Sequence, residues 1–295
     1  MMRHKVLFTS DVHGNEDQFK KFIDYAIQVR ADTLIIGGDI APKHFASDVY
    51  LSGQRRFLKE RLPELLKPLK QGLPEANLFM MMGNDDCAAN LDVLESYEPE
   101  FYQIMHGKRL SLTADFDIVG YAIVPITPFS VKDWEKYDLS DVPQDIEKRY
   151  AERKAAGYKL SGVKSVGDAH IPFTFSEDME KDDSIQKDLS AELFRKDAGK
   201  TVYVFHSPPD DTVLDQLEGG IHAGSFAIRH FIDEFQPYLA LHGHIHETVD
   251  ISGKFREDIG KTVCLSSGNH NEDKRLAVLV FDLYALSGVE RILSE

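Results

Sequence analysis

Five short apolar segments of this sequence each end in a loop that carries side chains able to bind a metal ion. The segments span residues 5–10, 33–36, 77–82, 201–205 and 238–241, and the loops after them supply Asp11 and His13, Asp39, Asn84, His206, and His244 and His246. Apolar runs of this length predict buried strands. Because ligands of open α/β proteins lie at the carboxyl ends of the strands, we expect all seven side chains to meet at one edge of the fold.

The segments between these strands predict helices on the outside of the sheets. Residues 16–27, which Asn15 can cap, show apolar side chains at helical spacing. Residues 54–70 carry a second such stripe, which we expect to be broken or kinked at its two prolines. Later segments predict a hairpin over 108–124 and a helix over 225–235. Early alternation of strands and helices, followed by hairpins, predicts mixed parallel and antiparallel sheets in an α/β protein.

Length and composition favour a single domain. Of the 295 residues, 42% are hydrophobic, which is enough for one large core, and we expect one domain over residues 1–295. Residues 130–200 differ, because they are rich in Lys, Glu and Asp. They predict an insertion over the core with helices near 142–156 and 180–195. Both a solvated decoration and a lid that sets substrate specificity fit such an insertion.

The charge of the chain restricts its partners. The 34 basic and 49 acidic side chains give a net charge of −15, so no basic excess is available to displace counterions from a nucleic-acid duplex or an anionic membrane. Two cysteines, Cys87 and Cys264, make no disulfide framework. The chain shows neither the apolar stretch of a signal peptide nor that of a membrane span. We therefore expect a cytoplasmic protein with no membrane partner.

The chemistry of the seven side chains points to two metal ions. Imidazole nitrogen with carboxylate and amide oxygen suits Mn, Fe, Zn, Co or Ni better than Ca. Seven ligands are too many for one open catalytic ion, but they suit two ions if one carboxylate bridges. Two dications, Asp11, Asp39 and a bridging hydroxide leave a local charge of about +1, which attracts phosphate. Many enzymes of phosphoryl transfer use two metal ions that lie about 3.5–4 Å apart.

The order of these motifs resembles the calcineurin-like metallophosphoesterases. The matching blocks are Asp11-x-His13, Gly38-Asp39, Gly83-Asn84-x-Asp86, His206 after an apolar run, and Gly243-His244-x-His246. The local sequences around His206 and His244 are most similar to those of a prokaryotic branch of predicted phosphoesterases related to cyclic-nucleotide phosphodiesterases. The resemblance covers residues 5–246. It implies a four-layer α/β/β/α sandwich of two mixed sheets flanked by helices.

The resemblance also implies a role for each ligand. One ion would be held by Asp11, His13, Asp39 and His246, and the second by Asp39 as the bridge, Asn84, His206 and His244. A hydroxide between two divalent ions, with manganese favoured, would attack a phosphomonoester or phosphodiester in line, and both ions would stabilise the developing charge. The expected protein is thus a metal-dependent phosphoesterase that acts on a small phosphorylated substrate.

One position departs from the family pattern. Much of the family has a histidine after Gly-Asn that protonates the leaving oxygen or holds the phosphate, and this chain has Asp85 there. An unperturbed aspartate has a pKa near 3.9 and is a poor acid at neutral pH, and nearby dications lower its pKa further. We therefore expect that the acid is missing, is supplied by another group, or is not needed for a good leaving group. Asp85 itself and His222, which is on a loop expected near the same edge, are the two candidate catalytic residues.

Two other functions remain compatible with the sequence. Some family members keep the fold with impaired metal sites and serve as non-enzymatic interaction scaffolds, although all seven ligands are present here. A pyrophosphatase or nuclease would use the same dinuclear site, and the acidic charge counts against a duplex nuclease. The sequence contains no Walker A loop, no G-x-S-x-G elbow and no H-E-x-x-H signature, which excludes those classes of hydrolase.

Overall fold

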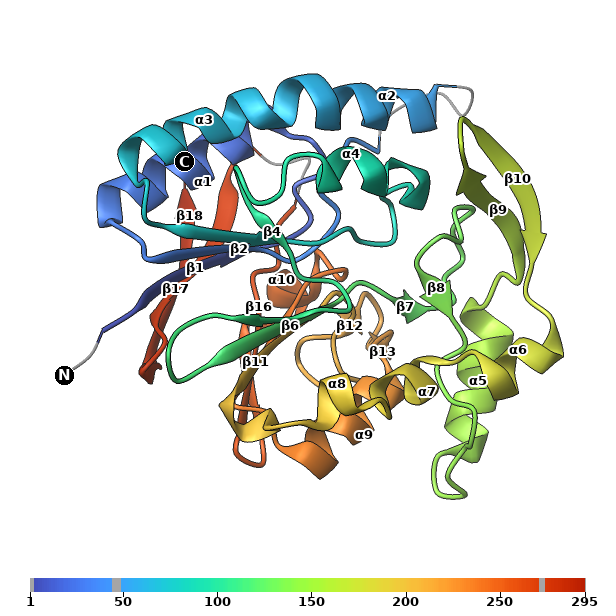
Figure 1. The fold of residues 1–295 in the computed structure, drawn as a ribbon. Helices are drawn as coiled ribbons and strands as arrows, with labels where there is room; N and C mark the ends of the chain where they lie inside the picture. Colours follow the sequence, from blue (N-terminus) through green and yellow to red (C-terminus); the bar gives the residue numbers. More distant parts are fainter. Residues whose placement is uncertain (1–2, 44–48, 271–273, 295) are drawn as a thin grey trace.

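A computed structural model describes residues 3–43, 49–270 and 274–294. Two six-stranded mixed sheets pack between two sets of helices, which gives four layers (Figure 1). This arrangement confirms the predicted α/β fold of two mixed sheets flanked by helices. No helix in the described ranges combines the length and the apolar character that a membrane span requires.

The first sheet has the strand order β18-β17-β1-β2-β3-β4. Its strands are β1 (Lys5–Thr9), β2 (Thr33–Ile36), β3 (Asn77–Met80), β4 (Gln103–Ile104), β17 (Leu276–Asp282) and β18 (Ala285–Ser294). Strands β1 to β4 run parallel, while β17 pairs antiparallel with β1. Helix α1 (Glu16–Val29) covers this sheet, and the Asn15 side chain caps it by accepting a hydrogen bond from the Gln18 backbone, as predicted.

The second sheet has the order β15-β16-β14-β11-β6-β5. Its strands are β5 (Arg109–Ser111), β6 (Asp117–Tyr121), β11 (Thr201–Phe205), β14 (Leu239–His242), β15 (Arg256–Ile259) and β16 (Thr262–Ser266). The predicted hairpin is confirmed as β5–β6, while β6, β11, β14 and β16 run parallel. Helices α7 (Ile185–Leu189), α8 (Glu192–Arg195) and α9 (Phe226–Phe235) lie on its outer face (Figure 1).

The helix that was expected to be broken or kinked at its prolines is not broken, but it is irregular beside the first of them. Helix α2 (Tyr50–Arg56), a π-helical turn (Phe57–Arg61) and α3 (Leu62–Gly72) follow one another without a gap. Pro63 is the second residue of α3 and Pro68 lies inside α3, so neither can donate a backbone hydrogen bond to the preceding helical turn. The wider π turn ends two residues before Pro63, so the irregularity of the helix lies beside this proline.

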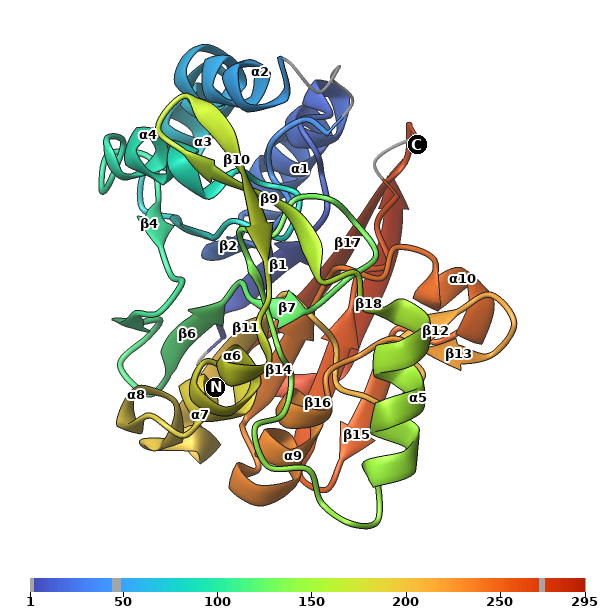
Figure 2. The same cartoon turned by 90° about the vertical axis from the view of Figure 1, so that its right-hand side faces the viewer.

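The charged segment 130–200 has more structure than its sequence indicates. It contains α5 (Glu147–Gly157), near the predicted helix, and a hairpin of β9 (Ser161–Val166) and β10 (Ala169–Thr174). The single helix expected over 180–195 is wrong, because α6 (Glu177–Asp182), α7 and α8 stand there instead. Helices α5 and α6 and the β9–β10 hairpin gather on one side of the sandwich (Figures 1 and 2).

The remaining short elements belong to the loops between these layers. They are the 3-10 turns at Ala88–Asn90 and Ala198–Lys200, α4 (Leu91–Glu95), β7 (Val124–Pro125), β8 (Glu135–Lys136), β12 (Gln216–Leu217), β13 (Ile221–His222) and α10 (Thr248–Ser252). Strands β7 and β8 pair with each other, as do β12 and β13.

Candidate metal centre

The structure brings the seven predicted ligands together where the parallel strands of both sheets end. Strands β1, β2, β3, β11 and β14 lead, respectively, to Asp11 and His13, to Asp39, to Asn84, to His206, and to His244 and His246. The first five are buried, whereas His244 and His246 are partly exposed. The backbone N–H of His244 donates to both carboxylate oxygens of Asp11 at 3.1 Å, which ties the end of the second sheet to the end of the first.

Four of these side chains form a first group. Ligand atoms of Asp11, His13, Asp39 and His246 all lie within 4.8 Å of one another. Nε2 of His246 is 3.3 Å from Nε2 of His13 and 3.4 Å from Oδ1 of Asp11. This is the set that the family resemblance assigns to one ion, and its spacing fits a single cation in the middle.

The other three side chains form a second group. Oδ1 of Asn84 lies 3.1 Å from Nε2 of His206 and 2.6 Å from Nδ1 of His244. The Nδ1 atom of His206 lies 2.8 Å from the carbonyl oxygen of Gly37, which acts as its acceptor. In the neutral ring this hydrogen bond leaves the lone pair on Nε2, which faces Asn84 and Asp39 and would bind a metal ion there.

Asp39 lies between the two groups. Its Oδ2 is 3.6 Å from Nε2 of His13 in the first group and 3.4 Å from Nε2 of His206 in the second. Its Oδ1 accepts a hydrogen bond of 2.8 Å from the backbone N–H of Asp85. The carboxylate is thus fixed in the position that a bridge between two ions requires.

The charge state of the centre suits cation binding. Burial alone raises the pKa of Asp11, but its hydrogen bond and charge interaction with His246 lower that pKa to about 2. For Asp39, the charges of His206 and His13 outweigh burial and hold its pKa well below the ordinary value. Burial lowers the pKa values of His13 and His244 to about 3. Against burial, Asp39 and Asp11 raise the pKa of His206 to about 10, and Asp11 raises the pKa of His246. The centre therefore offers ionised carboxylates and the neutral imidazoles of His13 and His244, whereas His206 and His246 would each release a proton on binding a metal.

The chemistry of the donors shows that the residues fit divalent transition ions. The nitrogen and oxygen donors match the preference of Mn, Fe, Zn, Co and Ni.

The backbone at the centre is strained. Asp11, His13, Asp39 and His244 all adopt positive φ angles, between 46° and 68°. L-residues other than glycine rarely occupy this region, at a cost of roughly 1–2 kcal/mol each, and such residues gather at functional sites. Four of the seven candidate ligands carry this strain, which indicates that the loops are shaped for their side chains rather than for stability.

Glycines beside the ligands allow the close approach of the loops. A Cβ on Gly83 would lie 2.3 Å from Oδ1 of Asp39, and one on Gly243 would lie 2.6 Å from Oδ2 of Asp11. Neither carboxylate can move away without leaving the centre. The glycines at these two positions are therefore required by the geometry of the ligands.

Two residues support the centre in roles that were not predicted from the sequence. The buried carboxylate of Asp86 accepts hydrogen bonds from the backbone of Ile40, Ala41 and Gly83, at 2.8–3.0 Å, and so joins the loops that carry Asp39 and Asn84. The side chain of Asn269 donates to the carbonyl oxygens of Ser10 and Asp11, at 3.0 and 3.3 Å. Asn269 follows a strand, as the ligands do, so its position after the 262–266 run was an available signal.

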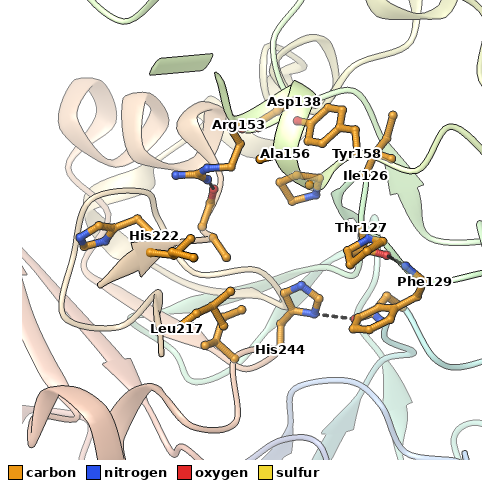
Figure 3. Close-up of a pocket in the computed structure, with 18 of the residues that line it drawn as sticks. Ile126, Thr127, Phe129, Asp138, Arg153, Ala156, Tyr158, Leu217, His222 and His244 are labelled. Atoms are coloured by element: carbon orange, nitrogen blue, oxygen red, sulfur yellow. Dashed lines mark hydrogen bonds between the residues drawn. The ribbon is translucent and has the colours of Figure 1, made fainter. Parts of the chain in front are cut away.

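The two candidate acids lie in different surroundings. Asp85 is close to the centre, with Oδ2 at 4.0 Å from both Nδ1 of His13 and Nζ of Lys43, and burial and the charge of Asp39 raise its pKa to about 7. His222 instead pairs with the buried Asp215 at 2.7 Å, and its ring points away from His244 (Figure 3). The structure brings Asp85 to the centre but not His222, and the catalytic role of each stays a prediction.

A cavity of about 730 Å³ opens directly from the centre, with Asp39, Asn84, His244 and His246 in its wall. Its opposite wall comes from residues 125–129 and from helix α5, which belong to the insertion or lie just before it, and the β12–β13 segment adds a third side (Figure 3). The sequence was compatible with either a solvated decoration or a lid for the insertion at 130–200. In the structure, helix α5 of this insertion lines the cavity.

Known proteins share both the sequence pattern and the fold. A family model described as calcineurin-like phosphoesterase matches residues 4–248. No curated protein sequence matches the chain. Among solved structures, TT1561 of Thermus thermophilus is 16% identical with a TM-score of 0.53 over 99% of each chain, which shows a common fold. A dimetal phosphatase from Danio rerio is 13% identical with a TM-score of 0.48 over 98% of each chain.

Proposed function

The chain belongs to the calcineurin-like phosphoesterase family, and we propose that it hydrolyses a small phosphomonoester or phosphodiester with the help of two divalent metal ions. The observation that carries this proposal is the position of Asp39, whose Oδ2 lies within 3.6 Å of a histidine from each ligand group. A carboxylate shared in this way lets seven side chains hold two ions.

The two ligand groups divide the work of binding. Asp11, His13, Asp39 and His246 would hold one ion, and Asp39, Asn84, His206 and His244 would hold the other. When bound, the ions would supply an activated water and neutralise the charge that develops on the phosphoryl oxygens. The mixed nitrogen and oxygen donors suit several transition ions, of which we propose manganese.

The remaining polar residues near the centre would orient the substrate. Lys43 and Asp85 both line the cavity, and their charged atoms are 4.0 Å apart. The ammonium group of Lys43 would attract a non-bridging phosphoryl oxygen. Asp85 stands where the family has a histidine, and it would assist departure of the alcohol by donating a proton to its oxygen.

The test is an assay of purified protein whose metal content has been measured. The protein loaded with Mn, Ni, Co or Zn should hydrolyse p-nitrophenyl phosphate, bis-p-nitrophenyl phosphate or both, and a chelator should abolish the activity without unfolding the chain. Protein that holds two ions and turns over neither ester would contradict the proposal. That outcome would favour a metal-binding interaction scaffold with the same fold.

A further inference from the structure

The cavity beside the metal centre has two chemically different ends. One end carries the candidate ligands, whereas much of the other is apolar, with Ile126, Phe129, Tyr158, Leu217 and Ile221 in its wall. Phe129 and Ile221 are 52% and 58% exposed. Apolar surface that is left open next to a reaction centre indicates a place for an apolar part of the ligand. We call this end of the cavity the apolar pocket.

Two polar side chains in the wall of the apolar pocket, Asp138 and Thr127, already have partners within the protein. Asp138 accepts hydrogen bonds from the hydroxyl of Ser225 and from two backbone N–H groups at the start of α9, at 2.6–3.2 Å. The hydroxyl of Thr127 donates to Glu135 and accepts from the backbone of Phe129. These groups are engaged elsewhere, so they offer little to a sugar or a base that needs hydrogen bonds.

The arginines of α5 are likewise engaged. Arg153 donates to Asp210 at 2.7 Å and to the carbonyl oxygen of Gly224 at 2.9 Å, and Arg149 pairs with the other oxygen of Asp210 at 2.7 Å. Their charges are therefore partly neutralised, and Glu152 in the same wall adds a negative charge. This balance disfavours a second phosphate group in the pocket. Lys43, whose Nζ lies 4.0 Å from Asp85, lines the end of the cavity at the metal centre.

The apolar wall is firmly built. Ile126 is buried in a small cluster with Tyr137 and Phe175, against which Tyr158 packs. Leu217 and Phe129 line the same cavity as His244, and Figure 3 draws them on either side of that ring, so the apolar surface and the ligands share one cavity. A phosphoryl group held at the metal centre would thus place its ester group against this surface.

We infer that the apolar pocket holds the alcohol portion of the substrate and that this portion is a bulky apolar alkyl or aryl group, rather than a sugar or a nucleoside. This inference rests on the proposed function, because it takes the metal centre as the place of the phosphoryl group. A cavity of about 730 Å³ is in the range of sites that enclose whole small-molecule ligands, so the group can be large.

The test measures binding rather than turnover. Methyl-, butyl- and octylphosphonate, which cannot be hydrolysed as esters, are titrated into metal-loaded protein by calorimetry, with glucose 1-phosphate as a hydroxyl-rich comparison. The dissociation constant should fall roughly fourfold for each methylene that enters the pocket. A dissociation constant that does not change with chain length would overturn the inference, as would equally tight binding of glucose 1-phosphate.

Variants locate the effect. Ile221→Ser and Phe129→Ser should each reduce the ratio of methyl- to octylphosphonate dissociation constants at least tenfold, and both change exposed side chains, so the fold should persist. Ile171→Ser is the matched control, because Ile171 is 45% exposed on β10, away from the cavity wall. An unchanged ratio in both pocket variants would overturn the inference. Failure of the p-nitrophenyl ester assay alongside a normal chain-length effect would instead count against the hydrolytic function.

Discussion

Replacement of Asp39 by asparagine should weaken the binding of both metal ions. The substitution keeps the size of the side chain and an oxygen that can accept the hydrogen bond from Asp85, but it removes the negative charge between His13 and His206. Loss of a residue that only supports a metal ligand typically costs 10- to 100-fold in affinity. Loss of a shared ligand should therefore cost each ion at least about 100-fold, or roughly 2.7 kcal/mol.

The measurement is a calorimetric titration with Mn²⁺ combined with elemental analysis after gel filtration. The Asp39→Asn protein should lose both ions, whereas His246→Gln should lose only the one held by the first group. Asp17→Asn is the matched control, because this aspartate is 74% exposed on α1 and should leave both ions in place. If Asp39→Asn lost a single ion and kept the other at wild-type affinity, the assignment of a bridging carboxylate would be refuted.

Three further substitutions test other parts of the account. If a missing acid limits turnover, Asp85→His should raise the hydrolysis rate of alkyl esters more than that of p-nitrophenyl esters. An equal change in rate for both classes of ester would show that the acid is not limiting. Gly243→Ala would place a Cβ 2.0 Å from Oγ of Ser10, so we expect the Mn²⁺ affinity to fall at least about tenfold in the same titration. Gly199→Ala is the control, because its Cβ would meet no atom within 4 Å and should leave the Mn²⁺ affinity unchanged. Burial lowers the pKa of His106 to about 4 from 6.5, so the folded chain keeps this imidazole neutral while the unfolded chain takes up a proton below pH 6.5. The free energy of unfolding should therefore fall as the pH is lowered from 6.5 to 4. In urea titrations, His106→Asn should reduce that fall by about 2–3 kcal/mol. An unchanged fall would count against a neutral buried histidine at this position.

The convergence of the seven candidate ligands was predictable because it depends on a simple relation between sequence and space. Apolar runs that end in Asp, Asn or His mark the carboxyl ends of buried strands, and parallel strands place those ends at one edge. The relation held for all five segments, including His206 and His244, which come from the second sheet. The same relation also applies to Asn269, but a side chain that binds backbone carbonyls rather than a metal has no distinct motif.

The insertion was less predictable, because its contacts are made between distant segments. Strand β9 has one buried side chain, so it lacks the alternation that marks a half-buried strand, and β10 contains Pro172. The expected helix over 180–195 is instead divided near Ser184 and Ser190, whose side chains bond to neighbouring backbone groups. The apolar pocket joins residues of three separate segments, and no local pattern contains that information.

The most direct test of the two-ion centre is anomalous scattering from crystals grown or soaked with Mn²⁺. We expect two peaks about 3.5–4 Å apart on either side of the Asp39 carboxylate, one near His13 and His246 and the other near His206 and His244. A single peak, or peaks that do not share Asp39, would contradict the account.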